Sequence, residues 1–357
     1  MPLDLTASSL DITRAICDIP SVSGEERALA DLIEEAVRAL DHLEVIREGN
    51  TIIARTNLGR TQRVAIAGHI DTVPINANVP SRDLVLDGEE FLWGRGTVDM
   101  KAGVAVQLKL AAELVEPVVD ITWMWYDNEE VEAARNGLKL LADRRPELFQ
   151  ADFAILGEPS NGEVEGGCNG TLRAVVRTAG VRAHSARSWI GENAIHRAAP
   201  LLARLAEYRA REITVDGLDY REGLNAVRIS GGVAGNVIPD LCEVEVNYRF
   251  APSKSAADAE AHVRRVFDGF AVEVTDVAEG ARPGLDAPIA RDFLAGVGAT
   301  PKPKYGWTDV ARFSALGIPA VNYGPGDPHL AHHDEERVPV AQIESTERGL
   351  RSWLSGV

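Results

Sequence analysis

The sequence predicts an α/β protein with two domains, in which a smaller α+β domain is inserted into an α/β catalytic domain. In the first part of the chain, helical stretches alternate with short apolar strands, as in a sheet covered by helices on both faces. The pattern changes after Pro159 and resumes after about Pro283. A chain of 357 residues is long enough for two hydrophobic cores. We therefore expect a catalytic domain over residues 1–165 and 283–357, and an inserted domain over residues 166–282.

In the first part, each element is predicted from its hydrophobic periodicity. Apolar residues at helical spacing indicate helices, the first of them with Ser23 as a plausible cap. Short runs rich in β-branched residues indicate buried strands. The predicted helices cover residues 25–40 and 101–115, and the predicted strands cover residues 50–56, 64–70, 118–126 and 153–156.

The inserted part has a different order of elements. A glycine-rich stretch over residues 162–170 leads into a strand, and the order strand–helix–strand–strand–helix–strand follows. This order is that of a ferredoxin-like domain. The strands are expected at residues 171–178, 226–232, 243–250 and 272–277, and the helices at residues 193–211 and 256–270.

Composition and charge exclude several classes of protein. The chain has 54 acidic and 37 basic residues, a net charge of −17, which repels nucleic acid and anionic membranes. No apolar run is long enough to span a membrane, and the first residues lack a secretory signal. The three cysteines form no CxxC pair, so neither disulfides nor a thiolate zinc site are indicated. We expect a cytoplasmic protein with no nucleic-acid or membrane partner.

Two motifs in the first part place polar side chains at the ends of predicted elements. His69 and Asp71 lie two positions apart at the end of a strand, so their side chains point to the same side. His69 could bind a metal ion that Asp71 helps to orient, or it could simply be solvated. Asp99 follows the glycine-rich turn GRGTVD and precedes a helix. It could bridge two cations with its two oxygens, or serve only as the N-cap of the helix.

Three further motifs carry acids or a histidine. Glu129 and Glu130 leave a buried strand side by side, where a cation or a raised pKa would relieve their repulsion. An acidic helix start is the ordinary alternative. Glu158, in LGEPS, ends another strand, and His332 lies in a His/acid cluster. Ligands gather at strand ends in open α/β sheets, and two imidazoles with three carboxylates suit zinc and, less exclusively, cobalt or manganese. The sequence therefore predicts two ions that share one bridging carboxylate.

The motifs GHIDTVP, GRGTVDMKAG, Glu129-Glu130, LGEPS and AHHDEERV, in this order and spacing, resemble the M20 metallopeptidase/deacylase family over essentially the whole chain. The resemblance implies two zinc ions in the active site of an amide hydrolase, with Asp71 orienting the metal site and Glu129 as general base. Its implied ligands are His69, Asp99 and Glu158 for the first ion, and Asp99, Glu130 and His332 for the second.

The same resemblance decides between two adjacent histidines and implies the architecture. The family's last motif, Ala-His followed after three residues by Glu, fits His332 with Glu336 and leaves His333 without an assigned role. The implied fold is a zinc-peptidase-like α/β catalytic domain with a ferredoxin-like insert that serves as a dimerisation or lid domain.

The inserted domain also resembles the family in its functional segments. In GVRAHSARSWIGENAI, His184 matches a histidine that reaches across a dimer to the substrate carbonyl. Asn236, Arg249 and Gly324 match positions that bind substrate, and the planar donor fork of arginine suits a carboxylate. Trp189 stands where many members have proline. The resemblance thus implies a homodimer that acts on a small molecule.

The implied substrate is an N-acylated amino acid. Segments such as KYGWTDVARF and GCNGTLR resemble family members that cleave N-succinyl-LL-2,6-diaminopimelate to succinate and LL-2,6-diaminopimelate, in lysine biosynthesis. Where those members commonly show Arg-Gly-Ser, this chain has Asn169 at the first position. Arg173, Arg182 or Arg187 would then have to bind the succinyl carboxylate.

Three alternative functions differ in what they require of the sequence. An acetylornithine deacetylase, or another amino-acid deacylase or peptidase of the family, would need no second anionic pocket. A non-catalytic metal-binding relative would have lost Glu129 or a ligand, and none is lost. A nucleotide-binding α/β protein is excluded because GRGTVDMKAG is neither GxGxxG nor a Walker loop.

Overall fold

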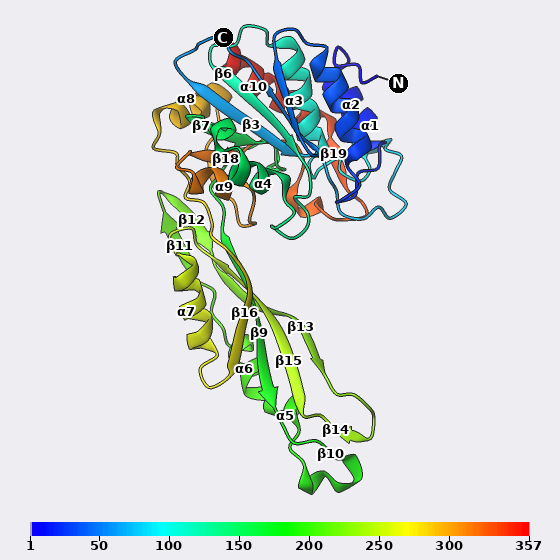
Figure 1. Ribbon diagram of the computed structural model, residues 1–357, viewed down its shortest axis with the longest axis vertical. Coiled ribbons are helices and arrows are strands. Elements are labelled where there is room, and N and C mark those ends of the chain that lie inside the picture. Colours follow the sequence, from blue (N-terminus) through cyan, green and yellow to red (C-terminus); the bar gives the residue numbers. More distant parts are fainter. Residues whose placement is uncertain (1, 357) are drawn as a thin grey trace. The chain divides into compact units, whose positions relative to one another are not determined.

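The computed structural model describes residues 2–356 as a mixed α/β protein of two compact units (Figure 1). Unit 1 comprises residues 2–166, 283–302 and 312–356, and unit 2 comprises Gly167–Arg282 and Pro303–Ala311. Residues 303–311, expected in the catalytic domain, belong to unit 2. In the structure, the side-chain amide of Asn169 donates to the carbonyl of Tyr305, and the indole of Trp307 donates to the carbonyl of Glu279, so this segment packs within unit 2.

Unit 1 is built on an eight-stranded sheet whose central strands are parallel. β3 pairs in parallel with β6 and β7, and β7 with β18. The carboxyl ends of these strands therefore meet at one edge of the sheet, where loops can bring side chains together. The strand order is β1 (Glu44–Glu48), β2 (Thr51–Arg55), β6 (Asp120–Tyr126), β3 (Arg63–His69), β7 (Phe153–Leu156), β18 (Ala320–Asn322), β8 (Glu165–Gly166) and β17 (Lys302–Pro303).

The central strands are buried on both faces. Ile66, Trp123 and Ile155 belong to the main core, which five helices complete. Met124 and Leu156 alternate with these residues, point to the other face and are also fully buried. The five helices are α1 (Ser9–Cys17), α2 (Arg27–Arg38), α3 (Lys101–Glu113), α8 (Pro288–Val297) and α10 (Val340–Ser355), and unit 1 also contains α4 (Gly137–Arg144) and η1 (Pro146–Phe149), while α9 (Val310–Ala315) spans its boundary.

A three-stranded sheet that we did not predict connects two distant parts of unit 1. β5 (Glu89–Trp93) pairs with β4 (Arg82–Leu86) on one side and with β19 (Arg337–Pro339) on the other. Because β5 ends just before the glycine-rich turn, and β19 begins just after the His/acid cluster, their pairing brings residues 94–99 beside residues 331–336.

Unit 2 contains the ferredoxin-like order of elements. Its antiparallel sheet has the order β13 (Gly223–Gly231), β15 (Leu241–Phe250), β9 (Gly170–Ala179) and β16 (Ala271–Ala278). Helices α5 (Ala194–Arg197), α6 (Ala199–Ala206) and α7 (Ala256–Val266) connect the strands. A core that includes Leu172, Val246 and Val263 fills one face of the sheet. The predicted two-domain α/β class is therefore confirmed.

The prediction of one long helix in unit 2 was wrong. We expected a single helix over residues 193–211, whereas the structure has α5 and α6, and α6 ends at Ala206. Pro200 has no N–H to donate to the carbonyl four residues earlier, which interrupts the helix. The chain then forms a hairpin of β11 (Glu212–Val215) and β12 (Leu218–Arg221), with Asp216 and Gly217 at positive φ in its turn. Within residues 2–356, no helix combines the length and apolar composition that a membrane crossing needs.

Candidate metal centre

Asp71 joins two loops at the carboxyl edge of the unit 1 sheet. Its buried carboxylate accepts backbone N–H groups of Glu129, at 3.0 Å, and Glu130, at 3.1 Å. The hydroxyl of Ser23 donates to the same carboxylate at 2.7 Å. Our assignment of Ser23 as a helix cap was wrong, because α2 begins at Arg27 and this hydroxyl serves Asp71 instead. Asp71 thus holds the two acidic residues after β6 beside the end of β3.

Asp99 lies between two imidazoles. Its Oδ1 is 3.1 Å from Nε2 of His69, and its Oδ2 is 3.4 Å from Nε2 of His332. The other ring nitrogen of His69, Nδ1, is 3.0 Å from the main-chain oxygen of Asp71. Burial opposes ionisation of Asp99, but hydrogen bonds from His332 and His69 hold the pKa of its carboxyl well below its usual value. Asp99 is therefore a carboxylate with one oxygen directed to each histidine.

Glu130 and His332 complete this group of side chains. Nε2 of His332 lies 2.9 Å from Oε2 of Glu130. Burial, and then the charge of Asp99, raise the pKa of Glu130, while hydrogen bonds to Asp99 and Glu130 raise the pKa of His332 to about 10. The proton on His332 thus partly neutralises the crowded carboxylates. A metal ion bound to His332 would take the place of that proton.

The structure brings His332, and not its neighbour His333, to the carboxylates. Nδ1 of His333 accepts the backbone N–H of Glu335 at 3.2 Å, and its carbonyl accepts a hydrogen bond from Arg95. His332 itself adopts a positive φ of 64°, in the left-handed region that few residues other than glycine occupy.

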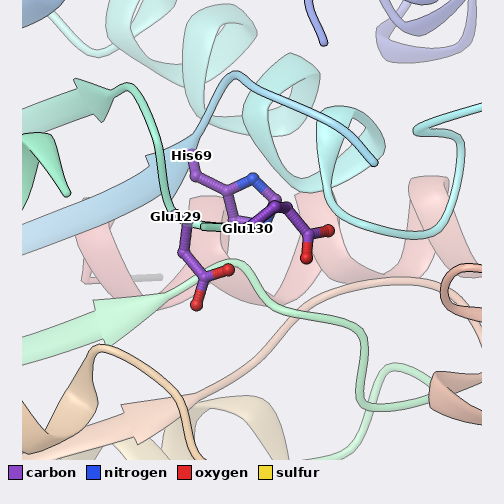
Figure 2. Close-up of side chains that lie close together, drawn as sticks. All are labelled: His69, Glu129 and Glu130. Carbon is purple, nitrogen blue, oxygen red and sulfur yellow. The ribbon is translucent and has the colours of Figure 1, made fainter. Parts of the chain in front are cut away.

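Three overlapping groups of side chains have potential ligand atoms within 4.8 Å of one another. Figure 2 shows one of them, in which the carboxylates of Glu129 and Glu130 point in different directions from the ring of His69. The converging carboxylates would repel one another without a cation, and the nitrogen and oxygen donors suit zinc. These side chains could therefore hold divalent cations, and Asp99 belongs to two of the three groups. The groups are His69, Asp99 and Glu158; Asp99, Glu130 and His332; and His69, Glu129 and Glu130.

A buried carboxylate that we did not assign to the site holds together the loops of two candidate ligands. Glu336 is 1% exposed, and its Oε1 accepts the backbone N–H groups of Val98, at 2.9 Å, and Asp99, at 3.0 Å. Its Oε2 accepts a hydrogen bond of 2.8 Å from the guanidinium of Arg95. Glu336 lies four residues after His332, so it connects the Asp99 loop with the His332 loop. The acid-rich end of the AHHDEERV motif was the available signal for it.

Gly324 and Asn169 have structural constraints of their own. A Cβ atom on Gly324 would lie 2.2 Å from the carbonyl oxygen of Gly157 and 2.6 Å from that of Glu158, so only glycine fits beside this segment. Asn169 is buried, and its amide donates to the carbonyls of Arg221, at 2.9 Å, and Tyr305, at 3.2 Å. The side-chain donors of Asn169 therefore serve the fold of unit 2.

Within unit 2, His184 lies beside the segment of Asn236. β10 (Ala183–His184) pairs with β14 (Val237–Ile238), and the N–H of Ser185 donates to the carbonyl of Asn236 at 2.9 Å. Nδ1 of His184 accepts the N–H of Ala186 at 3.1 Å. In the neutral ring the proton is then on Nε2, so this exposed imidazole can donate a hydrogen bond. Arg249 lies on β15, outside this two-stranded sheet.

The fold and the carboxylate–imidazole site together define a metal-dependent hydrolase. The chain belongs to peptidase family M20/M25/M40, whose model matches residues 65–355. It is 53% identical to a Mycobacterium tuberculosis protein named DapE, over 99% of this chain and 100% of that protein. It is 48% identical to the succinyl-diaminopimelate desuccinylase of Corynebacterium glutamicum, over 99% of this chain and 98% of that protein.

Solved structures share the fold at low sequence identity. A tripeptidase from Staphylococcus aureus matches with a TM-score of 0.78 and 21% identity, over 99% of both chains. The Bacillus subtilis YXEP protein, a dinuclear metal-binding peptidase of the M20 family, matches with a TM-score of 0.69 and 15% identity, over 97% of this chain and 96% of that chain.

Proposed function

We propose that this hydrolase cleaves N-succinyl-LL-2,6-diaminopimelate to succinate and LL-2,6-diaminopimelate at a centre of two zinc ions. The observation that carries the proposal is Asp99, whose two oxygens face His69 and His332. The choice of substrate is supported by the 48% identity to a succinyl-diaminopimelate desuccinylase over nearly the whole chain. The cytoplasmic location and the role in lysine biosynthesis stay predictions from the sequence.

The metal ligands would be those that the structure gathers into two groups. His69, Asp99 and Glu158 would hold one ion, and Asp99, Glu130 and His332 would hold the other. When bound, the two ions would supply positive charge that acidifies water and stabilises charge developing on the amide oxygen. Cobalt or manganese could replace zinc, because the donors are nitrogen and oxygen atoms.

Glu129 would act as the general base. Its backbone N–H is fixed by Asp71, while its carboxylate points to a different side of His69 from that of Glu130 (Figure 2). The carboxylate would accept a proton from the attacking water, and would then deliver this proton to the departing amine. Asp71 would orient His69 and hold both acidic residues in place.

Unit 2 would supply contacts to the substrate in a homodimer. His184 would donate from Nε2 to the amide oxygen, since its Nδ1 already accepts a backbone hydrogen bond. Asn236 and Arg249 would bind a carboxylate end of the substrate. In unit 1, Gly324, next to the Glu158 segment, would also contact the substrate. These roles rest on the resemblance to the M20 family and on the availability of the donors.

The substrate is tested by comparing two acyl groups on the zinc-loaded protein. We expect kcat/KM for N-succinyl-LL-2,6-diaminopimelate to exceed kcat/KM for N-acetylornithine. Both substrates contain an amide that the same site can hydrolyse, so the ratio reports the preference for acyl group and amine. Faster turnover of acetylornithine would overturn the substrate and leave the metal site in place.

A further inference from the structure

The face of the unit 2 sheet that lies opposite its core is polar and carries two neighbouring arginines. β9 and β15 are antiparallel, with Thr171 opposite Arg249 and Arg173 opposite Asn247. Residues directly opposite each other share a face, as do residues two positions apart on one strand. All four side chains therefore project from the same face, while the intervening residues of both strands fill the core.

Hydrogen bonds fix one of these arginines in place. Nε of Arg249 donates to Oδ1 of Asn247 at 3.0 Å, and Nδ2 of Asn247 donates to Oγ1 of Thr171 at 3.1 Å. This arrangement uses one of the five N–H donors of Arg249 and orients the plane of its guanidinium. The remaining donors keep their capacity for a ligand.

The two guanidinium groups influence each other and have no counter-ion. Burial, and then the positive charge of Arg173, lower the pKa of Arg249. Among residues 2–356, no carboxylate lies within the 4.0 Å ion-pair distance of Arg173 or Arg249. Asp276 lies opposite Arg173 on the neighbouring strand β16, but does not reach ion-pair distance. Two cations on one face with an anchoring amide favour an anionic ligand.

The other candidate arginines of unit 2 are less suitable. Both Nε and Nη2 of Arg182 donate to Asp240, at 3.1 and 2.8 Å. Arg177, on the same face of β9 as Arg173, forms ion pairs with Glu243 and Glu273. Arg187 is exposed in η2 (Ser185–Ile190) and, within the described part of the chain, has no side-chain hydrogen bond that orients it.

We propose that Arg173 and Arg249 form a two-arginine carboxylate site, in which Arg173 binds the carboxylate of the succinyl group. The proposal rests on the desuccinylase function proposed above, and it names the residue that takes over where Asn169 replaces the arginine of related enzymes. Arg249 has the role proposed for it above and binds the carboxylate on the amine side of the substrate. Arginine matches both ligands, since its planar fork can donate two parallel hydrogen bonds to one carboxylate.

The test substitutes Arg173 and compares substrates with and without the acyl carboxylate. In Arg173→Gln, KM for N-succinyl-LL-2,6-diaminopimelate should rise about 10- to 100-fold, as expected for a lost charge-assisted contact, with little change for N-acetylornithine. Calorimetric titration with succinate should show a comparable rise in Kd. Arg173→Lys, which keeps the charge without the fork, should give a smaller loss. Arg177→Gln removes the same charge from the same face, and should leave both KM and Kd unchanged.

Two results would overturn the role of Arg173. One is an Arg173→Gln protein that binds succinate and the succinyl substrate as Arg177→Gln does. The other is an equal loss for the succinyl and the acetyl substrates, which would show that the acyl carboxylate is not what Arg173 binds. Failure of the desuccinylase function itself would look different, because the unsubstituted protein would then fail to hydrolyse the succinyl substrate.

Discussion

Replacement of Glu336 by glutamine should lower the free energy of unfolding of unit 1 and should also lower the affinity of the protein for metal. The Glu336 carboxylate is 1% exposed and pairs with Arg95, which is 3% exposed. The glutamine oxygen can still accept the N–H groups of Val98 and Asp99, but the guanidinium loses its buried anion. The substitution therefore isolates the charge of Glu336 from its size.

The burial and the partners of this ion pair set the expected losses of unfolding free energy and of metal affinity. Breaking a buried ion pair from one side costs about 3–5 kcal/mol. Arg95 keeps hydrogen bonds to the carbonyls of Pro74 and His333. We therefore expect the free energy of unfolding to fall by about 3 kcal/mol, near the lower limit. Since Asp99 follows directly from the segment that Glu336 holds, metal affinity should fall about 10- to 100-fold, as for other residues that orient ligands.

Urea unfolding of the metal-free protein and zinc titration against a competing chelator measure these two effects separately. Glu335→Gln is the matched control, because it removes the same charge from the neighbouring residue, which is exposed. Equal free energies of unfolding and equal zinc affinities for Glu336→Gln and Glu335→Gln would refute this reasoning, because Glu336 would then not position Asp99.

Three further predictions concern single side chains. Glu129→Gln should lose most of its turnover and retain two zinc ions, and full activity would exclude Glu129 as the base. His332→Ala should reduce the number of bound zinc ions by one, whereas His333→Ala should bind as many as the unsubstituted protein; the reverse result would reassign the ligand. In unit 2, burial and then the charges of Arg211 and Lys254 lower the pKa of His262 to about 4, and Arg211 donates to its Nδ1. Because the unfolded chain binds this proton at about pH 6.5, urea-unfolding stability should fall between pH 6.5 and 4 by at most about 3 kcal/mol, and His262→Gln should lessen that fall.

The candidate ligands were predictable because they lie at the ends of strongly apolar strands. The buried strands β3, β6 and β7 follow from their sequence, and they place His69, the Glu129 pair and Glu158 at one edge. The approach of the Asp99 and His332 loops was not predictable in this way. It depends on pairing of β5 with β19, which are short, partly exposed strands with a weak pattern and a separation of more than 240 residues.

Other differences between the predicted and the observed structure have physical causes that are either local or long-range. Pro200 was a visible signal against one long helix, and the Asp216–Gly217 turn was a visible signal for the hairpin that follows. The role of Glu336 could not be derived from spacing, since its partners come from a segment far away in the sequence. The placement of Arg173 and Arg249 on one face of the unit 2 sheet was equally hard to derive, because it depends on the register of β9 and β15.

The most direct test of the two-ion centre is the number of zinc ions bound per chain after equilibrium dialysis. We predict two ions for the unsubstituted protein, and fewer than one for Asp99→Ala, because Asp99 faces both histidines. A single ion in the unsubstituted protein, or two ions retained without Asp99, would contradict a centre built around this bridging carboxylate.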